Sequence, residues 1–173
     1  MSTILTLHDP HTARAYYAEG LWRGDTLYSL ARGHGAARPA AFALRDAAQR
    51  LSWSELLAWL DSVAEDLHQA GVKRGQRVSV WLPSRAESIV VLLACSRNGY
   101  VCNPSLHQNY TAGEVLELLA RIECAALVAQ PAYGADAARH DIFAEAAALP
   151  GMCRVYCVQP RGKPAAEDRK SVV

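Results

Sequence analysis

Few residues of this chain have types and spacings that could do chemistry by themselves. The sequence contains neither G-x-G-x-x-G nor G-x-x-x-x-G-K-[ST], the spacings that hold nucleotide phosphates on backbone amides. Gly33 and Gly35 form the closest glycine pair, but no lysine or hydroxyl residue stands beside them, which predicts a plain loop. His34, His68 and His140 have no companions that would order them into a triad or a ligand set. The motifs therefore predict no catalytic residue.

The five cysteines also lack the spacing of a metal site. Cys153 and Cys157 are four residues apart across an expected strand, and no second pair completes four ligands. We interpret the cysteines as reduced, structural thiols, which favours a cytoplasmic location.

The composition limits the class of protein. A chain of 173 residues with 51% apolar and 20% charged residues fits one globular domain. The net charge of +1 lacks the excess of basic residues that is typical of proteins that bind nucleic acid. The first residues do not resemble a signal peptide, and the longest apolar run, residues 89–95, is too short to span a bilayer. We therefore expect neither a nucleic-acid partner nor a membrane span.

Three helix starts pair a hydroxyl residue with a glutamate three positions later, as in a capping box: Ser52 with Glu55, Ser84 with Glu87 and Thr111 with Glu114. They begin helices expected over residues 53–70, 86–97 and 112–123. Short apolar segments predict strands over residues 42–45, 77–82, 100–103, 126–129 and 154–158, with a further helix over 141–149. Strands separated by helices of this length predict an α/β fold with a mostly parallel sheet and helical crossovers.

The pattern of apolar residues along the chain changes twice, near residue 40 and near residue 160, and so divides the chain into three parts. Residues 1–40 are expected to form an N-terminal helical and loop segment, with helices near residues 12–20 and 25–32. Residues 41–159 are expected to form the α/β subdomain. Residues 160–173 are rich in proline, glycine and charge, which predicts a linker or a disordered tail.

Three segments carry a family resemblance: LSWSELL (residues 51–57), GVKRGQRVSVWLPSRAES (71–88) and LLACSRNGYVCNPSLHQNYTAGEVLELL (92–119). Together they resemble the N-terminal portion of AMP-forming acid–CoA ligases, in the adenylate-forming superfamily. The resemblance covers roughly residues 42–158 and departs from the usual pattern at Gln76, where these enzymes often have an acid, and at Ser84-Arg85. NPSLHQNYT is most similar to ligases of alicyclic or aromatic carboxylic acids, such as cyclohexanecarboxylate–CoA ligase.

The resemblance implies a reaction that joins a carboxylic acid to CoA, with ATP and Mg²⁺ consumed through an acyl-adenylate to AMP and pyrophosphate. In the family the phosphate loop, the acidic nucleotide motif, the hinge and the C-terminal lysine lie in later segments, and none matches this sequence. We therefore expect an N-terminal fragment that is inactive alone and binds no cofactor tightly. Alternatives are a standalone interaction module derived from the family, or an inactive stub. Apolar surface left exposed would favour a homo-oligomer.

The resemblance also implies one tentative contact region for CoA. In benzoate-ligase relatives an arginine following the Asn-Pro pair meets the 3′-phosphate of CoA. Here Ser105 takes that position and brings one hydrogen bond without charge. His107 can supply part of the charge when protonated, and Arg139 is a weaker candidate. The alternative for each is an ordinary loop or surface residue.

Overall fold

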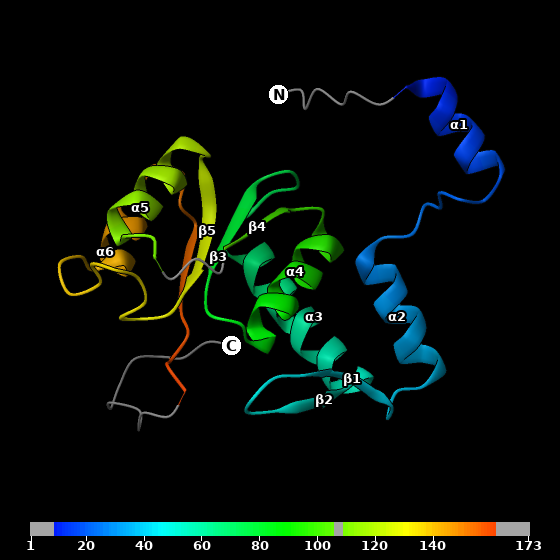
Figure 1. The fold of residues 1–173 in the computed structure, drawn as a ribbon, viewed down its shortest axis with the longest axis horizontal. Coiled ribbons are helices and arrows are strands. Elements are labelled where there is room, and N and C mark those ends of the chain that lie inside the picture. The colour runs from blue at the N-terminus through cyan, green and yellow to red at the C-terminus, as the bar shows by residue number, and fades with distance from the viewer. Residues whose placement is uncertain (1–8, 106–108, 162–173) are drawn as a thin grey trace.

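The computed structural model describes residues 9–105 and 109–161 (Figure 1). Its helices are α1 (Pro10–Ala18), α2 (Leu27–Ala37), α3 (Trp53–Gln69), α4 (Ala86–Asn98), α5 (Ala112–Arg121) and α6 (Ile142–Ala147). Its strands are β1 (Phe42–Arg45), β2 (Arg50–Ser52), β3 (Arg77–Trp81), β4 (Val101–Ser105), β5 (Cys124–Ala129) and β6 (Arg154–Cys157). No helix within the described ranges has the length and apolar character needed to cross a bilayer.

Four strands form a parallel sheet in the order β4-β3-β5-β6, and β1 and β2 form a separate antiparallel hairpin. The register aligns the carboxyl ends of the four strands, because Trp81 at the end of β3 pairs with both Ser105 and Ala129. Helices α3 and α4 cover one face of the sheet, and α5 and α6 cover the other (Figure 1). The α/β prediction with a parallel sheet is confirmed.

The apolar pattern of the sequence supplies a core on each face. On the α3–α4 side, the helix stripe and the sheet bury Leu56, Leu60, Val63, Leu67, Val78, Val80, Val90 and Val91. On the α5–α6 side, the buried set includes Trp81, Val115, Leu119, Leu127, Ile142 and Ala146. All six residues of β5 are buried, as expected for a central strand of a sheet covered on both faces.

Two of the three capping boxes are confirmed. The Ser52 hydroxyl accepts from the backbone amide of Glu55, and the Glu55 carboxylate accepts from the amide of Ser52 at 2.8 Å. Thr111 and Glu114 make the same reciprocal pair at the start of α5. Both helices therefore begin where the local pattern places them.

The capping box predicted at the start of α4 is wrong. The N-cap residue is Arg85, and its side chain makes no cap hydrogen bond. The amide of Ala86 instead donates to a carboxylate oxygen of Asp46, 2.8 Å away in the turn between β1 and β2. Glu87 turns to the Arg85 guanidinium, because a buried carboxylate gains more from a buried cation than from a backbone amide.

The loop predicted at Gly33 and Gly35 is also wrong, since both lie inside α2. A Cβ on Gly35 would lie 2.1 Å from Cδ1 of Leu57, so the missing side chain lets α2 approach α3 closely. The His34 ring lies 4.9 Å from the ring of Trp53 on α3. Packing on α3 therefore overrides the low helix propensity of glycine.

Candidate functional site

The carboxyl edge of the parallel sheet is the candidate functional site. In open α/β sheets, ligands bind outside the carboxyl ends of the strands, where the connecting loops gather. In this chain that edge collects the loops after β3 and β5, the described part of the loop after β4, and residues 158–161 after β6.

A charged cluster of Asp46, Arg85, Glu87 and Arg161 occupies this edge. The Arg85 guanidinium donates to both Glu87 oxygens, at 3.1 Å from Nε and 2.6 Å from Nη2. Its Nη1 donates to Gln130 Oε1 at 2.8 Å and to the carbonyl of Gln159 at 2.9 Å. The side chains of Arg85 and Glu87 are only 6% and 8% exposed. One buried arginine therefore ties together the loops after β3, β5 and β6.

Arg161 completes the charged cluster from the segment after β6. Its guanidinium pairs with Asp46 and, at 3.0 Å, with Oε2 of Glu87. The hydrogen bond from Arg161 holds the pKa of Asp46 well below its usual range, against the opposing effect of burial, with further help from the amide of Ala86. Burial raises the pKa of Glu87, but hydrogen bonds and charge from Arg85, with the charge of Arg161, outweigh it, so the net pKa is lowered.

The charged cluster holds the loops of the site in place, and its charges are taken up by one another and not by a ligand. Two cations face two carboxylates, and every nitrogen of the Arg85 guanidinium donates to a protein acceptor. Buried pairs of this kind are costly to break, because removing one partner leaves an uncompensated charge. The cluster therefore fixes the relative positions of four segments that are distant in sequence.

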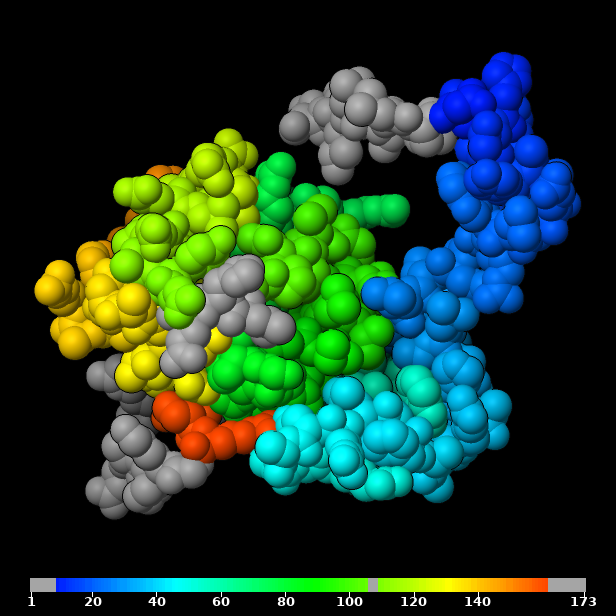
Figure 2. Space-filling view, in the orientation of Figure 1, coloured from blue at the N-terminus to red at the C-terminus, as the bar shows by residue number. Residues whose placement is uncertain are grey.

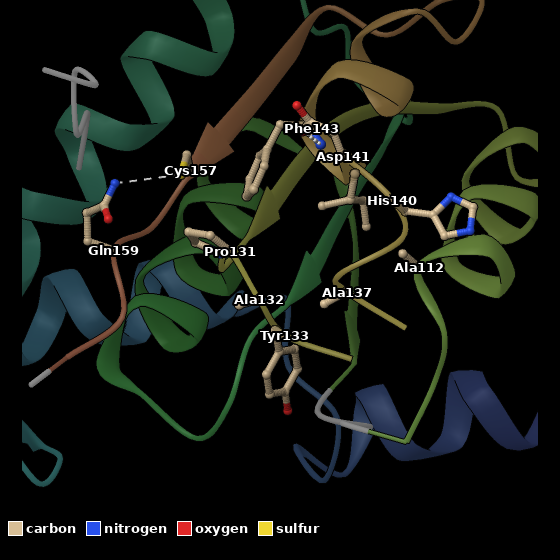
Figure 3. A pocket seen from close by; sticks show the side chains of 11 residues that line it. Ala112, Pro131, Ala132, Tyr133, Ala137, His140, Asp141, Phe143, Cys157 and Gln159 are labelled. Carbon is tan, nitrogen blue, oxygen red and sulfur yellow. Dashed lines mark hydrogen bonds between the residues drawn. The ribbon is translucent and has the colours of Figure 1, made fainter. Parts of the chain in front are cut away.

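Beside the charged cluster lies a pocket of 330 Å³, which we call the edge pocket (Figure 3). Its walls are mainly apolar, with a few polar groups at the rim: Ala112, Pro131, Ala132, Tyr133, Ala137, His140, Asp141, Ile142, Phe143, Cys157 and Gln159. Its position at the ends of β5 and β6 and its apolar lining are those of a small-molecule site.

His140 lies at the rim of the edge pocket between two carboxylates. Nε2 is 3.4 Å from Asp136 and Nδ1 is 3.1 Å from Glu145. Asp136 also accepts from the amide of Ala112 at the start of α5. From the sequence we expected no triad or ligand set around His140, and we did not predict that two carboxylates flank the ring. Asp136 lies four residues before His140 and Glu145 five after, a local spacing that could have indicated the group.

The loop after β5 is bound to the loop after β4. The amide of Ala135 donates to the carbonyl of Tyr110 at 3.1 Å. The ring of Tyr133 packs edge-on against Trp81, with 5.4 Å between centroids. These contacts bring together the segments that hold two of the three sequence-predicted site residues.

Ser105 ends β4, is half-buried and accepts from the amide of Leu82 through its carbonyl at 3.4 Å. Arg139 is exposed on the loop after β5, where its amide donates to the carbonyl of Asp136 at 2.8 Å. His107 lies outside the described residues. The structure thus places Ser105 at the end of β4 and Arg139 on the loop after β5, which contacts Tyr110 in the segment that follows β4. Their role as CoA contacts stays a prediction.

Sequence reasoning missed the charged cluster entirely. Asp46 and Arg161 come from segments far apart in the chain, so no local pattern indicates that they meet. Within the described ranges, no three histidine, cysteine, aspartate or glutamate side chains gather as a metal site requires.

Comparison with known proteins decides the family. The AMP-binding enzyme family matches residues 31–171, which include the whole parallel sheet and the charged cluster. The chain belongs to this family. Among its relatives in the family is the 2-hydroxy-7-methoxy-5-methyl-1-naphthoate–CoA ligase of Streptomyces carzinostaticus, 33% identical over 70% of this chain and 22% of that protein. The salicyl-AMP ligase of Mycobacterium tuberculosis is 34% identical over 51% of this chain and 17% of that protein.

Among solved structures, apo MbtA of Mycobacterium smegmatis superposes on this chain with a TM-score of 0.70 at 28% identity. That likeness covers 88% of this chain and 28% of the MbtA chain. The matches therefore span between 17% and 28% of the length of these relatives.

Proposed function

We propose that this chain forms the N-terminal α/β portion of an AMP-forming acid–CoA ligase, which converts a carboxylic acid, ATP and CoA into acyl-CoA, AMP and pyrophosphate. The observation that carries the proposal is the family match over residues 31–171, together with the gathering of four strand ends at one edge. Aromatic acids are the favoured substrate class, because relatives include ligases named for naphthoate and salicylate.

In this proposal the chain supplies a scaffold and a CoA-facing edge, and the groups that act on ATP come from the rest of the fold. Ser105 ends β4 and Arg139 lies on the loop after β5, and contacts through Tyr110 and Asp136 join that loop to the segment between β4 and α5. A guanidinium on such a loop suits a phosphate, because charge-assisted hydrogen bonds are short and strong. ATP and Mg²⁺ would be held outside this chain, so the isolated chain is expected to form no AMP.

A chimaera tests the proposed function. The chain replaces the segment that it matches in the Streptomyces carzinostaticus naphthoate–CoA ligase, and naphthoyl-CoA formation is measured alongside the isolated chain. We expect activity from the chimaera and none from the isolated chain. A folded chimaera that binds its substrates but forms no acyl-CoA would contradict the proposal.

The CoA contact is tested in the same chimaera by Arg139→Ala. The KM for CoA should rise roughly tenfold, the equivalent of one charge-assisted hydrogen bond of about 1.5 kcal/mol. Dephospho-CoA, which lacks the 3′-phosphate, should show no such difference. Arg121→Ala is the control, since Arg121 ends α5 at the opposite edge of the sheet. Equal effects with CoA and dephospho-CoA would remove Arg139 from the site.

A further inference from the structure

A second pocket lies at the amino edge of the parallel sheet, at the opposite end of the strands from the edge pocket and the charged cluster. It has a volume of 370 Å³, and its walls come from the end of α3, the turn before β3, the end of α4 and the residue before β4: His68, Val72, Lys73, Arg74, Asn98 and Tyr100. Two permanent cations and a histidine line one hollow, which we call the basic pocket.

The positive charge of the basic pocket is not neutralised by the described part of the chain. Its three basic side chains are exposed, and none of them makes an ion pair within residues 9–105 and 109–161. The acidic side chains in the second half of α3 are bound elsewhere: Asp61 to Arg97 at 3.1 Å, Glu65 to Gln69 at 3.1 Å and Asp66 to Arg154 at 2.9 Å. The nearby carboxylates therefore leave the pocket with an excess of positive charge.

The helix ends beside the basic pocket do not account for this charge. At the end of α3, the amide of Val72 donates to the carbonyl of Leu67 at 3.1 Å. At the end of α4, the amide of Tyr100 donates to the carbonyl of Cys95 at 2.9 Å. Backbone amides thus bind carbonyls that a basic side chain could otherwise cap. Each helix end carries about half a negative charge, so the two together balance only one of the two permanent cations.

The turn that carries Lys73 and Arg74 is held in place before any ligand arrives. The amide of Lys73 donates to Oε1 of Gln76 at 2.7 Å, and the amide of Gly75 donates to the carbonyl of Gly99 at 2.8 Å. The Arg74 side chain lies over Gly99, where an added Cβ would be 3.1 Å from Cγ and 3.2 Å from Nε of the arginine. A guanidinium whose stem is already packed loses less entropy on binding an anion.

This combination of groups suits a phosphoryl dianion. A guanidinium binds phosphate oxygens through two parallel N–H bonds, and a lysine adds a compact positive charge. We propose that the basic pocket binds a phosphoryl group, either as inorganic phosphate or as part of a small organic molecule. The pocket and the edge pocket share no lining residue, so this inference does not rest on the proposed function.

The first test is a titration of the 173-residue chain with inorganic phosphate, followed by the amide signals of its NMR spectrum at constant ionic strength. We expect saturable shifts at residues 68, 72–76 and 98–100. Arg74→Gln should weaken the apparent affinity about tenfold, as the loss of a charge-assisted hydrogen bond would. Arg32→Gln, an exposed position on α2, is the control and should leave the affinity unchanged. Shifts that do not saturate, or that are equally large around Arg32, would overturn the proposal.

Gln76→Glu separates the charge of the pocket from its fold. Glutamate keeps an oxygen that can accept from the Lys73 amide, but it adds a negative charge beside the two permanent cations. The apparent affinity for phosphate should fall about as much as in Arg74→Gln, whereas the thermal midpoint in chloride should not fall. An unchanged affinity for phosphate in this variant would show that the positive charge of the turn is not used for binding.

Thermal midpoints in phosphate and in chloride give a second readout. Phosphate stabilises folded proteins in general, because it is excluded from their surfaces, so the measure is the difference between variants. The wild type should gain more from phosphate than the double variant Lys73→Gln with Arg74→Gln, because only a specific site adds the stabilisation of a bound ligand. Equal gains in the two proteins would contradict the proposal.

Glycerol 3-phosphate distinguishes the two sources of the phosphoryl group. Tighter binding than inorganic phosphate, with the same response to Arg74→Gln, would assign the pocket to an organic phosphate. Weaker binding would assign it to the free ion. Saturable binding of neither compound would overturn the site.

Discussion

Arg161 shows how one side chain joins segments that are distant in sequence. It pairs with Asp46 from the turn after β1 and with Glu87 from α4. Both carboxylates have lowered pKa values in the folded protein, for the causes described above. A carboxylate with a lowered folded pKa stabilises the protein above its unfolded pKa of about 4 and loses that contribution as the pH falls through the folded value.

Arg161→Met should therefore destabilise the protein in a pH-dependent way. At pH 7 we expect a loss of about 2 kcal/mol in the free energy of unfolding, between the values for exposed and buried ion pairs. The difference from the wild type should shrink below about pH 4, as the carboxylates become protonated. Urea unfolding at several pH values measures it, with exposed Arg32→Met as the control. A constant difference down to pH 3 would mean that the ion pairs are not its source.

At the scale of elements, the loop after β5 depends on one glycine. Gly134 has φ +111°, which side-chain-bearing residues rarely adopt. A Cβ at this position would lie 2.6 Å from Cη2 of buried Trp81 and 2.9 Å from the carbonyl of Tyr110. The close approach of the loops after β4 and β5 therefore requires a residue without a side chain.

Gly134→Ala should destabilise the protein by about 2–4 kcal/mol and displace the loop that carries Arg139. The free energy of unfolding and the fluorescence of Trp81 would report the two effects. Gly33→Ala is the matched control, because Gly33 lies inside α2 with open space around its Cα and negative φ. The control should be neutral or stabilising by up to about 1 kcal/mol. Equal effects in both variants would contradict the steric argument.

Features that depend on contacts between neighbouring residues could be predicted from the sequence, whereas features that depend on contacts between distant segments could not. Helix α3 begins at a cap closed within four residues, between Ser52 and Glu55, so the pattern is sufficient. Helix α4 begins with the same pattern, but Glu87 is bound by cations that include one from beyond β6. The same limit applies to the hairpin, because β2, which pairs with β1, was not among the strands expected from the sequence.

The candidate site follows the same division. The strand ends, and hence the edge where ligands are expected, could be placed from apolar segments alone. The edge pocket could not, because its walls come from the loop after β5, the starts of α5 and α6, and the chain around the end of β6, whose meeting depends on backbone contacts such as Ala135 with Tyr110. The CoA role of Ser105, His107 and Arg139 came only from resemblance and stays a prediction.

At the scale of the whole molecule, two cores share one sheet. Leu60 on α3 and Leu119 on α5 are almost wholly buried on opposite faces. Between them lie β3 and β5, which contribute side chains to both cores. Neither core can be lost while the sheet remains, so we expect a single cooperative unfolding transition.

Leu60→Ala and Leu119→Ala test this coupling. Each should lower the free energy of unfolding by about 2–5 kcal/mol, since each leaves a cavity in a packed core. Circular dichroism, which reports all helices, and tryptophan fluorescence should give the same midpoint in each variant. Two separated transitions in either variant would show that the faces unfold independently.

The strand order has a consequence for synthesis of the chain on the ribosome. Strand β3 lies in the interior of the sheet, yet its two neighbours are made at different times, first β4 and then β5. The stretch between Ser105 and Ala129 takes on the order of a few seconds to translate. During that interval β3 has a partner on one side only, and Val78 and Val80 belong to a strand with an open edge. Aggregation competes with folding in those seconds, before β5 closes the sheet.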